Sequence, residues 1–177
     1  MRSIYKILNQ EELYFVTSTI VEWLPVFNSD KYYSILMEAI RFSQIKRNLK
    51  LYAYVLLDNH FHLIVTGDDL TNIFKSIKGY TAKEIIKQLR MDQNEEFLNQ
   101  FRINKQKHKV KSEFQVWQES FHPQEILTDN IFQQKIDYIH MNPVRRGLVK
   151  EPEEWKYSSA GYFATGSEGV LHLNGLD

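Results

Sequence analysis

The stretch that decides the fold is YAYVLLDNHFHLIV, residues 52–65. Its first half is an apolar run typical of a buried strand, Asp58-Asn59 is a turn signal, and the following HFHLIVTG predicts a second strand. Side chains two residues apart on a strand project to the same face, so His60 and His62 should point together. The residues between and after them, Phe61 and Leu63, should then point the opposite way, into an apolar layer. The pattern therefore predicts a hairpin that holds two imidazoles on one face.

Outward from this hairpin, the sequence alternates between strand and helix patterns. Residues 13–23 are rich in β-branched and aromatic residues and predict a first strand, and residues 113–121 predict a fourth. Residues 28–50 and 68–90 carry apolar side chains at helical spacing, and Gly79 marks a point where the second of these helices could kink. Between the second helix and the fourth strand we expect a loop or an irregular hairpin. A third helix is predicted over residues 128–143, with Thr128 or Asp129 as its cap and Pro143 at its end.

The resulting order is strand, helix, strand, strand, helix, strand, helix. Its first six elements form the split βαβ, or ferredoxin-like, arrangement. We therefore predict an α+β fold with a four-stranded antiparallel sheet, two helices on one face, an extra C-terminal helix and a loop-rich tail. Residues 1–149 are expected to form the domain, with residues 150–177 as a C-terminal tail that packs on the same domain.

Composition limits the class of protein. The chain has 177 residues, 43% of them apolar and 25% charged, which suits one soluble globular domain. It has no cysteine, which excludes disulfides and thiolate metal sites and fits a cytoplasmic protein. It shows no signal peptide and no apolar run of transmembrane length, so we expect no membrane partner.

Charge gives a mixed indication about nucleic acid. The formal net charge is zero, which argues against broad nonspecific binding to a polyanion. Residues 97–112, however, contain no acid and carry a cluster of basic side chains. This segment could be a solvated loop or a phosphate-binding strip.

The histidine pair has two interpretations from the residues alone. Two imidazoles at this spacing can hold one metal ion, or they can be surface histidines on an exposed sheet face. Because no cysteine is available, nitrogen and oxygen ligands would favour Mg²⁺ or Mn²⁺ over a structural zinc.

A second informative segment is KIDYIHMNPVRRGLV, residues 135–149. Tyr138 and Asn142 lie one turn apart on the same side of the predicted helix, beside its buried stripe, so both could face one site. Alternatively, Tyr138 is a packing residue with its hydroxyl at the edge, and Asn142 is the helix C-cap before Pro143.

Together these motifs resemble a known family. LDNHFHLIV is similar to the histidine–hydrophobe–histidine (HUH) motif of single-tyrosine transposases, which is usually preceded by Pro-Asn. YIHMNPVRRGLV, followed by PEEWKYSSAGYF, resembles the signature of the REP-associated tyrosine transposase (RAYT) group, and VWQESFHPQEI resembles the segment that precedes it. The resemblance extends over about residues 13–163, and the two motifs in this order are far more specific than either alone.

The resemblance implies a metal-dependent nuclease and strand transferase that acts on single-stranded DNA through a 5′-phosphotyrosine. By motif position, His60 and His62 would be metal ligands, Tyr138 the nucleophile and Asn142 the third ligand, with Mg²⁺ or Mn²⁺ as cofactor. Members of the group act on DNA with short imperfect palindromes, so the expected partner is single-stranded or hairpin DNA, bound by a monomer or a homodimer.

Several side chains are candidates for DNA contact, although each could equally be a solvated surface charge. Aromatic residues of the tail could stack on bases or hold the tail to the core; these are Trp155, Tyr157 and Tyr162. The candidates for phosphate contact are Lys75, Lys78, Lys83, Arg102, Lys105, Lys107, Lys109, Lys111, Arg145 and Arg146.

The sequence departs from the family pattern at two positions. Asp58 stands where proline is usual, and it could supply an acid near the metal. Arg146 stands where a small residue is commoner, which we expect to change only the surface charge. Two other functions remain open: a DNA-binding regulator that has the fold without the chemistry, and an unrelated metal-dependent hydrolase that uses the histidine pair and water.

Overall fold

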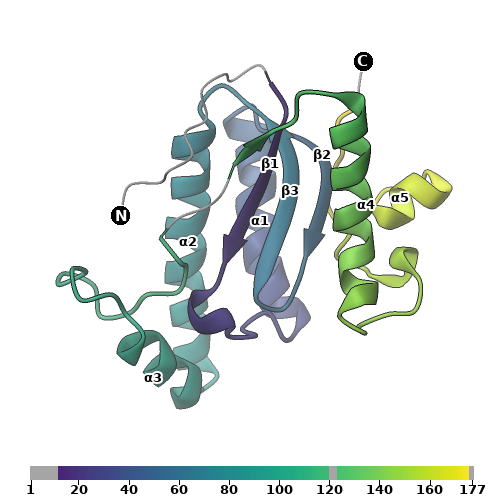
Figure 1. Cartoon of the computed structure of the whole chain (residues 1–177). Helices are drawn as coiled ribbons and strands as arrows, with labels where there is room; N and C mark the ends of the chain where they lie inside the picture. The colour runs from purple at the N-terminus through teal and green to yellow at the C-terminus, as the bar shows by residue number, and fades with distance from the viewer. Residues whose placement is uncertain (1–11, 120–122, 176–177) are drawn as a thin grey trace.

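The computed structural model describes residues 12–119 and 123–175 and is built on one antiparallel sheet (Figure 1). The strands are β1 (Tyr14–Thr19), β2 (Lys50–Leu56), β3 (His60–Thr66) and the short β4 (Gln124–Glu125), in the order β2-β3-β1-β4. In this order β3 separates β1 from β2, as in a split βαβ unit. The predicted α+β fold with a four-stranded antiparallel sheet is confirmed.

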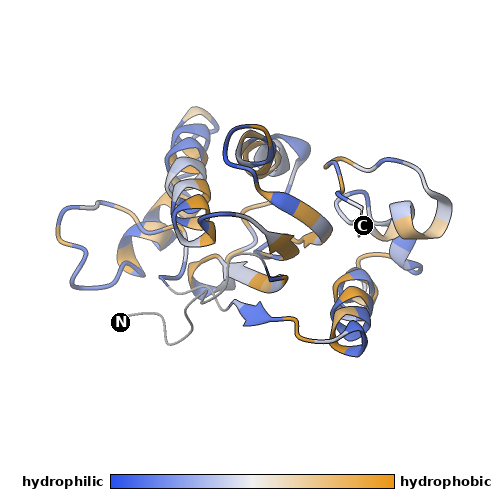
Figure 2. Ribbon diagram, turned by 90° about the horizontal axis from the view of Figure 1, so that it is seen from above, coloured by the Kyte–Doolittle hydropathy of each residue, from blue (hydrophilic) through white to orange (hydrophobic). Residues whose placement is uncertain are grey.

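Helices cover both faces of the sheet (Figures 1 and 2). The larger apolar cluster joins one face to α1 (Asp30–Lys46) and α2 (Leu70–Met91), as predicted. The smaller cluster joins the other face to α4 (Asp129–Arg145). The remaining short helices are α3 (Glu95–Ile103), α5 (Ala160–Thr165) and the 3₁₀ turns η1 (Val21–Trp23) and η2 (Pro152–Glu154).

The alternation along β3 decides which face receives the histidines. Phe61 and Leu63 belong to the cluster under α1 and α2, whereas Ile64 belongs to the cluster under α4. His60 and His62 have the same parity as Ile64, so they project toward α4. The predicted division of this strand between imidazoles and core is therefore confirmed.

The fourth strand was predicted in the wrong place. Residues 113–119 form only a single bridge, between Trp117 and Ile20, and β4 begins at Gln124 instead; residues 120 and 121 of the predicted strand lie outside the described residues. The apolar side chains that suggested a strand are buried for another reason: Trp117 packs in the main core and donates from Nε1 to Thr81 Oγ1 at 2.9 Å. Burial of an irregular segment produced the apolar pattern.

The segment expected to be a loop contains helix α3. Its N-cap is Asn94, whose side chain accepts a hydrogen bond from the Phe97 backbone at 3.1 Å, and acids occupy its first turn. Leu98 and Phe101 are buried on the core. These signals were hidden because the excess of lysine and arginine in the same stretch dominated its composition.

Helix α4 extends beyond the predicted end at Pro143. Thr128 is its N-cap as expected, with its side chain accepting from the Ile131 backbone. The chain stays helical to Arg145 and turns at Gly147, whose φ of +69° is a conformation that favours glycine. Pro143 has no N–H to donate, but the residues after it still close the final turn, in which the Arg146 N–H donates to the Asn142 carbonyl at 3.1 Å, and this turn brings Arg146 toward the hairpin. Helix α2 likewise passes Gly79 without interruption.

The tail packs along β2 and α1. Leu171 is buried in the main core, and the Tyr54 hydroxyl accepts a hydrogen bond from its backbone. The Asn174 backbone N–H donates to the Leu51 carbonyl, and the Asn174 side-chain oxygen accepts from the Leu51 N–H. No helix in the described ranges has both the length and the apolarity that a membrane crossing requires.

Candidate active site

Residues from four separate segments meet at a hollow of about 350 Å³ on the α4 side of the sheet. Strand β1, the turn after it, the β2–β3 hairpin and helix α4 each contribute to its wall. Both predicted histidines and both predicted helix residues are present, so segments some 75 residues apart in sequence do converge as the motifs imply. The lining side chains are Thr17, Trp23, Asn59, His60, His62, Tyr138, Asn142 and Arg146.

Neighbouring side chains orient the two imidazoles. His62 Nδ1 lies 2.7 Å from Thr17 Oγ1, and Thr17 is its partner across the β1–β3 ladder. His60 Nδ1 lies 2.6 Å from Asn59 Oδ1. The ring centroids of the two histidines are 4.8 Å apart. With both Nδ1 atoms engaged in this way, Nε2 is the nitrogen of each ring that is left to bind a ligand.

The surroundings keep both histidines neutral. Burial lowers the pKa of His60 to about 4, and the positive charge of Arg146 contributes. Burial also lowers the pKa of His62 to about 3, assisted by His60 and Lys135. A metal ion binds the neutral imidazole, so at neutral pH the pair is in the form that coordination requires.

The donor atoms fit a divalent cation. His62 Nε2 is buried and has no hydrogen-bond partner, which is a costly state for a polar atom unless a ligand satisfies it. Within residues 12–119 and 123–175, no three side chains of the His, Cys, Asp or Glu type are grouped to hold a metal. Asn142, on α4, lines the same hollow with its amide side chain.

Tyr138 lies at the mouth of the hollow. Its ring is 5.2 Å from the His62 ring and 5.9 Å from the Phe15 ring, both measured between centroids and both edge-to-face. Tyr138 is 41% exposed, so part of the residue is open to solvent. The Arg145 guanidinium lies 5.6 Å from the centre of the same ring. Tyr138 thus lies beside the His62 ring and the Arg145 guanidinium.

The two departures from the family pattern are paired with each other. Arg146 Nη1 donates to Asp58 Oδ1 at 2.5 Å and to Asn59 Oδ1 at 3.2 Å. The expectation that Arg146 changes only the surface charge is wrong, because the final turn of α4 carries its guanidinium to the hairpin. The Asp58 carboxylate, which could otherwise have supplied an acid near the metal, is paired with this arginine.

The predicted DNA-contact residues have different surroundings. Lys78 is largely buried and donates to the backbone carbonyls of Gln118 and Glu119. Lys105 donates to two backbone carbonyls of its own loop. Three others face solvent without a salt bridge among the described residues: Lys75, Lys83 and Lys107. Arg102 and Lys109 pair with acids, at Glu113 and Glu119, and Lys111 is exposed.

The tail aromatics mostly hold the tail. Trp155 donates from Nε1 to the Leu56 carbonyl, and Tyr157 is buried, with its ring stacked on Tyr33 at 3.7 Å between centroids. Tyr162 alone of the three is exposed.

Sequence reasoning missed Thr17, Trp23 and Asn59. Asn59 was identified as a turn residue, and its contact with His60 Nδ1 could have been inferred from its position next to that histidine. Thr17 could be found only with the β1–β3 register, and Trp23 only with the path of the chain after β1, neither of which one sequence provides.

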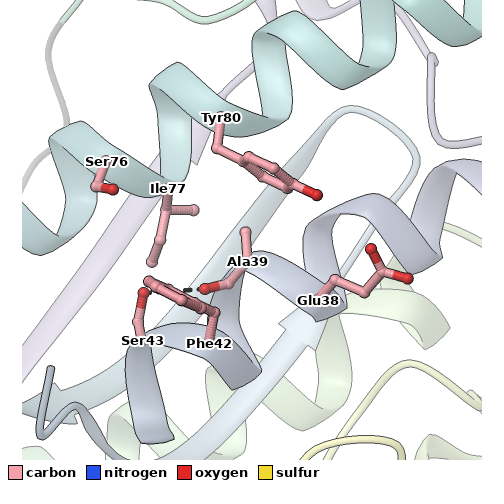
Figure 3. A pocket seen from close by; sticks show the side chains of 7 residues that line it. All are labelled: Glu38, Ala39, Phe42, Ser43, Ser76, Ile77 and Tyr80. Atoms are coloured by element: carbon pink, nitrogen blue, oxygen red, sulfur yellow. Dashed lines mark hydrogen bonds between the residues drawn. The ribbon is translucent and has the colours of Figure 1, made fainter. Parts of the chain in front are cut away.

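A second hollow of about 400 Å³ lies between α1 and α2, on the face of the sheet away from the histidines (Figure 3). Its wall is mainly apolar and includes the exposed rings of Phe42 and Tyr80. It contains no histidine and is separated from the first hollow by the sheet.

Comparison with known proteins agrees with the sequence motifs. No family model matches the chain. Over 107 residues it is 29% identical to a protein of Haemophilus influenzae described as a candidate REP-associated tyrosine transposase, covering 60% of this chain and 56% of that protein. Over 131 residues it is 27% identical to a REP-associated tyrosine transposase of Escherichia coli, covering 72% and 64%. The chain thus matches less than two thirds of the length of either relative.

The same group appears among solved structures. A REP-associated tyrosine transposase bound to a REP hairpin superposes with a TM-score of 0.68 and 20% sequence identity, over 100% of this chain and 94% of that one. At this identity the likeness establishes a shared fold. Together with the two sequence relatives, it confirms the resemblance that the two motifs indicate.

Proposed function

We propose that this protein is a single-tyrosine enzyme that cuts and rejoins single-stranded DNA at hairpin sites through a 5′-phosphotyrosine, as a transposase or its domesticated form. The observation that carries the proposal is the convergence of Tyr138 and Asn142 with His60 and His62 in one hollow. The resemblance to REP-associated tyrosine transposases, one of which is solved with a REP hairpin, supports the choice of substrate.

The tyrosine would supply the nucleophile. Tyr138 Oη attacks the scissile phosphorus, the bond from phosphorus to the 3′ oxygen breaks, and that oxygen leaves as a 3′-hydroxyl after taking a proton from water. The phenol proton is lost to solvent, to which the 41%-exposed side chain has access. Because the phosphodiester energy is kept in the protein–DNA bond, another 3′-hydroxyl can reverse the step and join a different strand.

The remaining residues would position and neutralise the phosphate. His60, His62 and Asn142 would hold Mg²⁺ or Mn²⁺, which supplies a positive charge to polarise a non-bridging phosphate oxygen. Arg145, whose guanidinium is 5.6 Å from the Tyr138 ring centre, can bind a phosphate oxygen. Phe15 packs against both the His62 and the Tyr138 rings, which limits how far they can separate.

A covalent-adduct assay tests this function. The substrate is a 3′-labelled oligonucleotide with a REP-like hairpin and a single-stranded flank, incubated with Mn²⁺. The label should migrate with the protein on a denaturing gel, because the 3′ fragment is the one attached through its 5′ phosphate. Tyr138→Phe should abolish the adduct, while Tyr162→Phe should retain it; Tyr162 is similarly exposed but lies on α5, outside the hollow.

The other two functions predict different results. A DNA-binding regulator would shift the labelled hairpin in a native gel but form no adduct with any variant. A metal-dependent hydrolase that uses water would cleave without an adduct, and Tyr138→Phe would cleave at the wild-type rate. Either result would overturn the proposal.

A further inference from the structure

The indole of Trp23 is an exposed aromatic surface at the rim of the candidate active site. Its side chain is 56% exposed and lines the same hollow as His60, His62 and Tyr138. The Trp23 and His60 ring centroids are 5.4 Å apart, with the rings nearly perpendicular. An exposed ring of this size that borders a polar hollow offers a flat apolar face to a ligand.

The backbone that presents this ring is strained. Glu22 has a φ of +51° and Trp23 a φ of +53°, so two consecutive residues with side chains adopt the left-handed conformation. This conformation is costly for a bulky residue and persists only where the surrounding structure enforces it. Such strain tends to cluster at functional sites, and here it turns the tryptophan outward at the hollow.

The surrounding contacts that enforce this conformation come from both sides of the turn. The Asn59 side chain donates from Nδ2 to the Trp23 carbonyl at 2.9 Å, and the Ile20 backbone N–H donates to the Asn59 carbonyl at 2.8 Å. Further along, Phe27 N–H donates to the Asp58 carbonyl at 2.9 Å, and both Val26 and Phe27 are fully buried. The backbone that carries the exposed ring is therefore held by hydrogen bonds to the Asp58-Asn59 turn, which also precedes the histidine pair.

We propose that Trp23 is a stacking platform for an unpaired nucleobase next to the scissile phosphate. This inference rests on the proposed function and adds to it a binding subsite for the base. Single-stranded nucleic acids bind by stacking bases on aromatic rings, and a ring that is already held in place loses little entropy on binding. A phosphate held beside Tyr138 would leave the adjoining base within the hollow that Trp23 borders.

The subsite is tested by binding, in a Tyr138→Phe background that prevents cleavage. The probes are oligothymidine of about 12 nucleotides, a length within the usual range of single-strand sites, and an abasic oligomer of equal length. Trp23→Ala should weaken oligothymidine binding roughly five-fold to a hundred-fold, as loss of one stacked base would. Trp23→Phe should retain part of the affinity, and binding of the abasic oligomer should not change with either variant.

Indole fluorescence gives a direct second readout. The other two tryptophans, Trp117 and Trp155, are buried or partly buried, so the difference in emission between the background protein and its Trp23→Phe form reports Trp23. Oligothymidine should quench this difference, and the abasic oligomer should not. As a control, Phe42→Trp in the Trp23→Phe form places an exposed indole beside the second hollow on the opposite face (Figure 3), where we expect no quenching.

The outcomes separate the subsite from the chemistry. Equal weakening of both oligomers by Trp23→Ala, or an absence of quenching, would overturn the subsite even if the wild-type protein forms the adduct. Quenching and base-dependent affinity in a protein that forms no adduct would overturn the proposed chemistry and leave the base-binding role of Trp23 standing. A protein that binds neither oligomer would overturn the subsite, and the adduct assay on the hairpin substrate would then decide the chemistry by itself.

Discussion

Arg146 and Asp58, which are 88 residues apart in the sequence, form an ion pair between the end of α4 and the β2–β3 turn. Both are departures from the pattern of the family that the chain resembles, and each is the ion-pair partner of the other. The pair links the helix that carries Tyr138 to the hairpin that carries His60, through contacts of Arg146 with both Asp58 and Asn59. We interpret it as a clamp that fixes the two halves of the site relative to each other.

The clamp should appear as an energetic coupling between the two residues. The side chains of Arg146 and Asp58 are 31% and 28% exposed, so the pair is only partly screened by solvent. In a double-mutant cycle of Arg146→Ala and Asp58→Ala, urea unfolding should give a coupling of about 0.5–1 kcal/mol. The more exposed Glu84–Lys87 pair of α2 serves as the control and should give less. Strict additivity of the two clamp substitutions would show that the contact contributes nothing.

The hydroxyl that orients His62 should affect metal affinity. Thr17→Val removes the Oγ1 atom 2.7 Å from His62 Nδ1 and preserves the shape of the side chain. Partners of this kind commonly change metal affinity by about 10–100-fold, so we expect Mn²⁺ binding, measured by titration calorimetry, to weaken by that factor. His62→Ala should remove it. Thr19→Val, a buried change on the same strand, should bind Mn²⁺ like the wild type; equal affinity in the Thr17 variant would argue against this role.

Local patterns predicted the parts of the site that depend on one element. The two-residue period of β3 placed His60 and His62 on one face, and the helical period of α4 placed Tyr138 beside Asn142. The order of strands and helices along the chain followed from the same two kinds of periodicity. What could not be predicted were contacts that depend on register and chain path: Thr17 opposite His62, Asn59 against Trp23, and the strained turn after β1. Such contacts join segments that are far apart in the sequence. A local sequence pattern does not predict which of these segments lie close together in space.

The misplaced fourth strand has a related cause. An apolar, aromatic stretch predicts burial, and burial was correct for Val116 and Trp117. Whether a buried segment is a strand depends on which backbone groups pair with it. Here the Gln115 N–H donates to the Phe101 carbonyl of α3, and pairing with the end of β1 is limited to the single bridge at Trp117. The helix that supplies this carbonyl lies in the stretch expected to be a loop.

Lys78 should make stability depend on pH in the alkaline range. Burial lowers the pKa of Lys78 from its ordinary 10.5 to about 8 in the folded protein. The unfolded chain then binds more protons between these values, so the wild type should gain stability as pH rises from about 8 to 10.5. Relative to Lys78→Gln, that gain should be at most roughly 3 kcal/mol.

The comparison uses urea unfolding at a series of pH values for both proteins. Below pH 8 the ammonium is charged in both states and its burial penalty is fully present, so the two curves should run parallel there. Lys83→Gln, an exposed change on the same helix, controls for the general titration of lysines and should leave the wild-type pH dependence unchanged. Parallel curves for wild type and Lys78→Gln up to pH 10.5 would contradict the assigned pKa.

Ser159 should be the polar residue whose loss most weakens the attachment of the tail to the sheet. It is fully buried, and its hydroxyl accepts from the Tyr54 N–H at 2.9 Å and lies 2.9 Å from His140 Nε2. Ser159→Ala leaves the N–H of a central β2 residue buried without this partner, at a cost of about 1–3 kcal/mol in unfolding free energy. Urea unfolding measures it, with Ser167→Ala, an exposed change in the same tail, expected to stay within about 0.5 kcal/mol of wild type. Because His140 is on α4 two residues after Tyr138, a Ser159→Ala protein of unchanged stability would mean that the tail adds nothing to the support of α4 at this point.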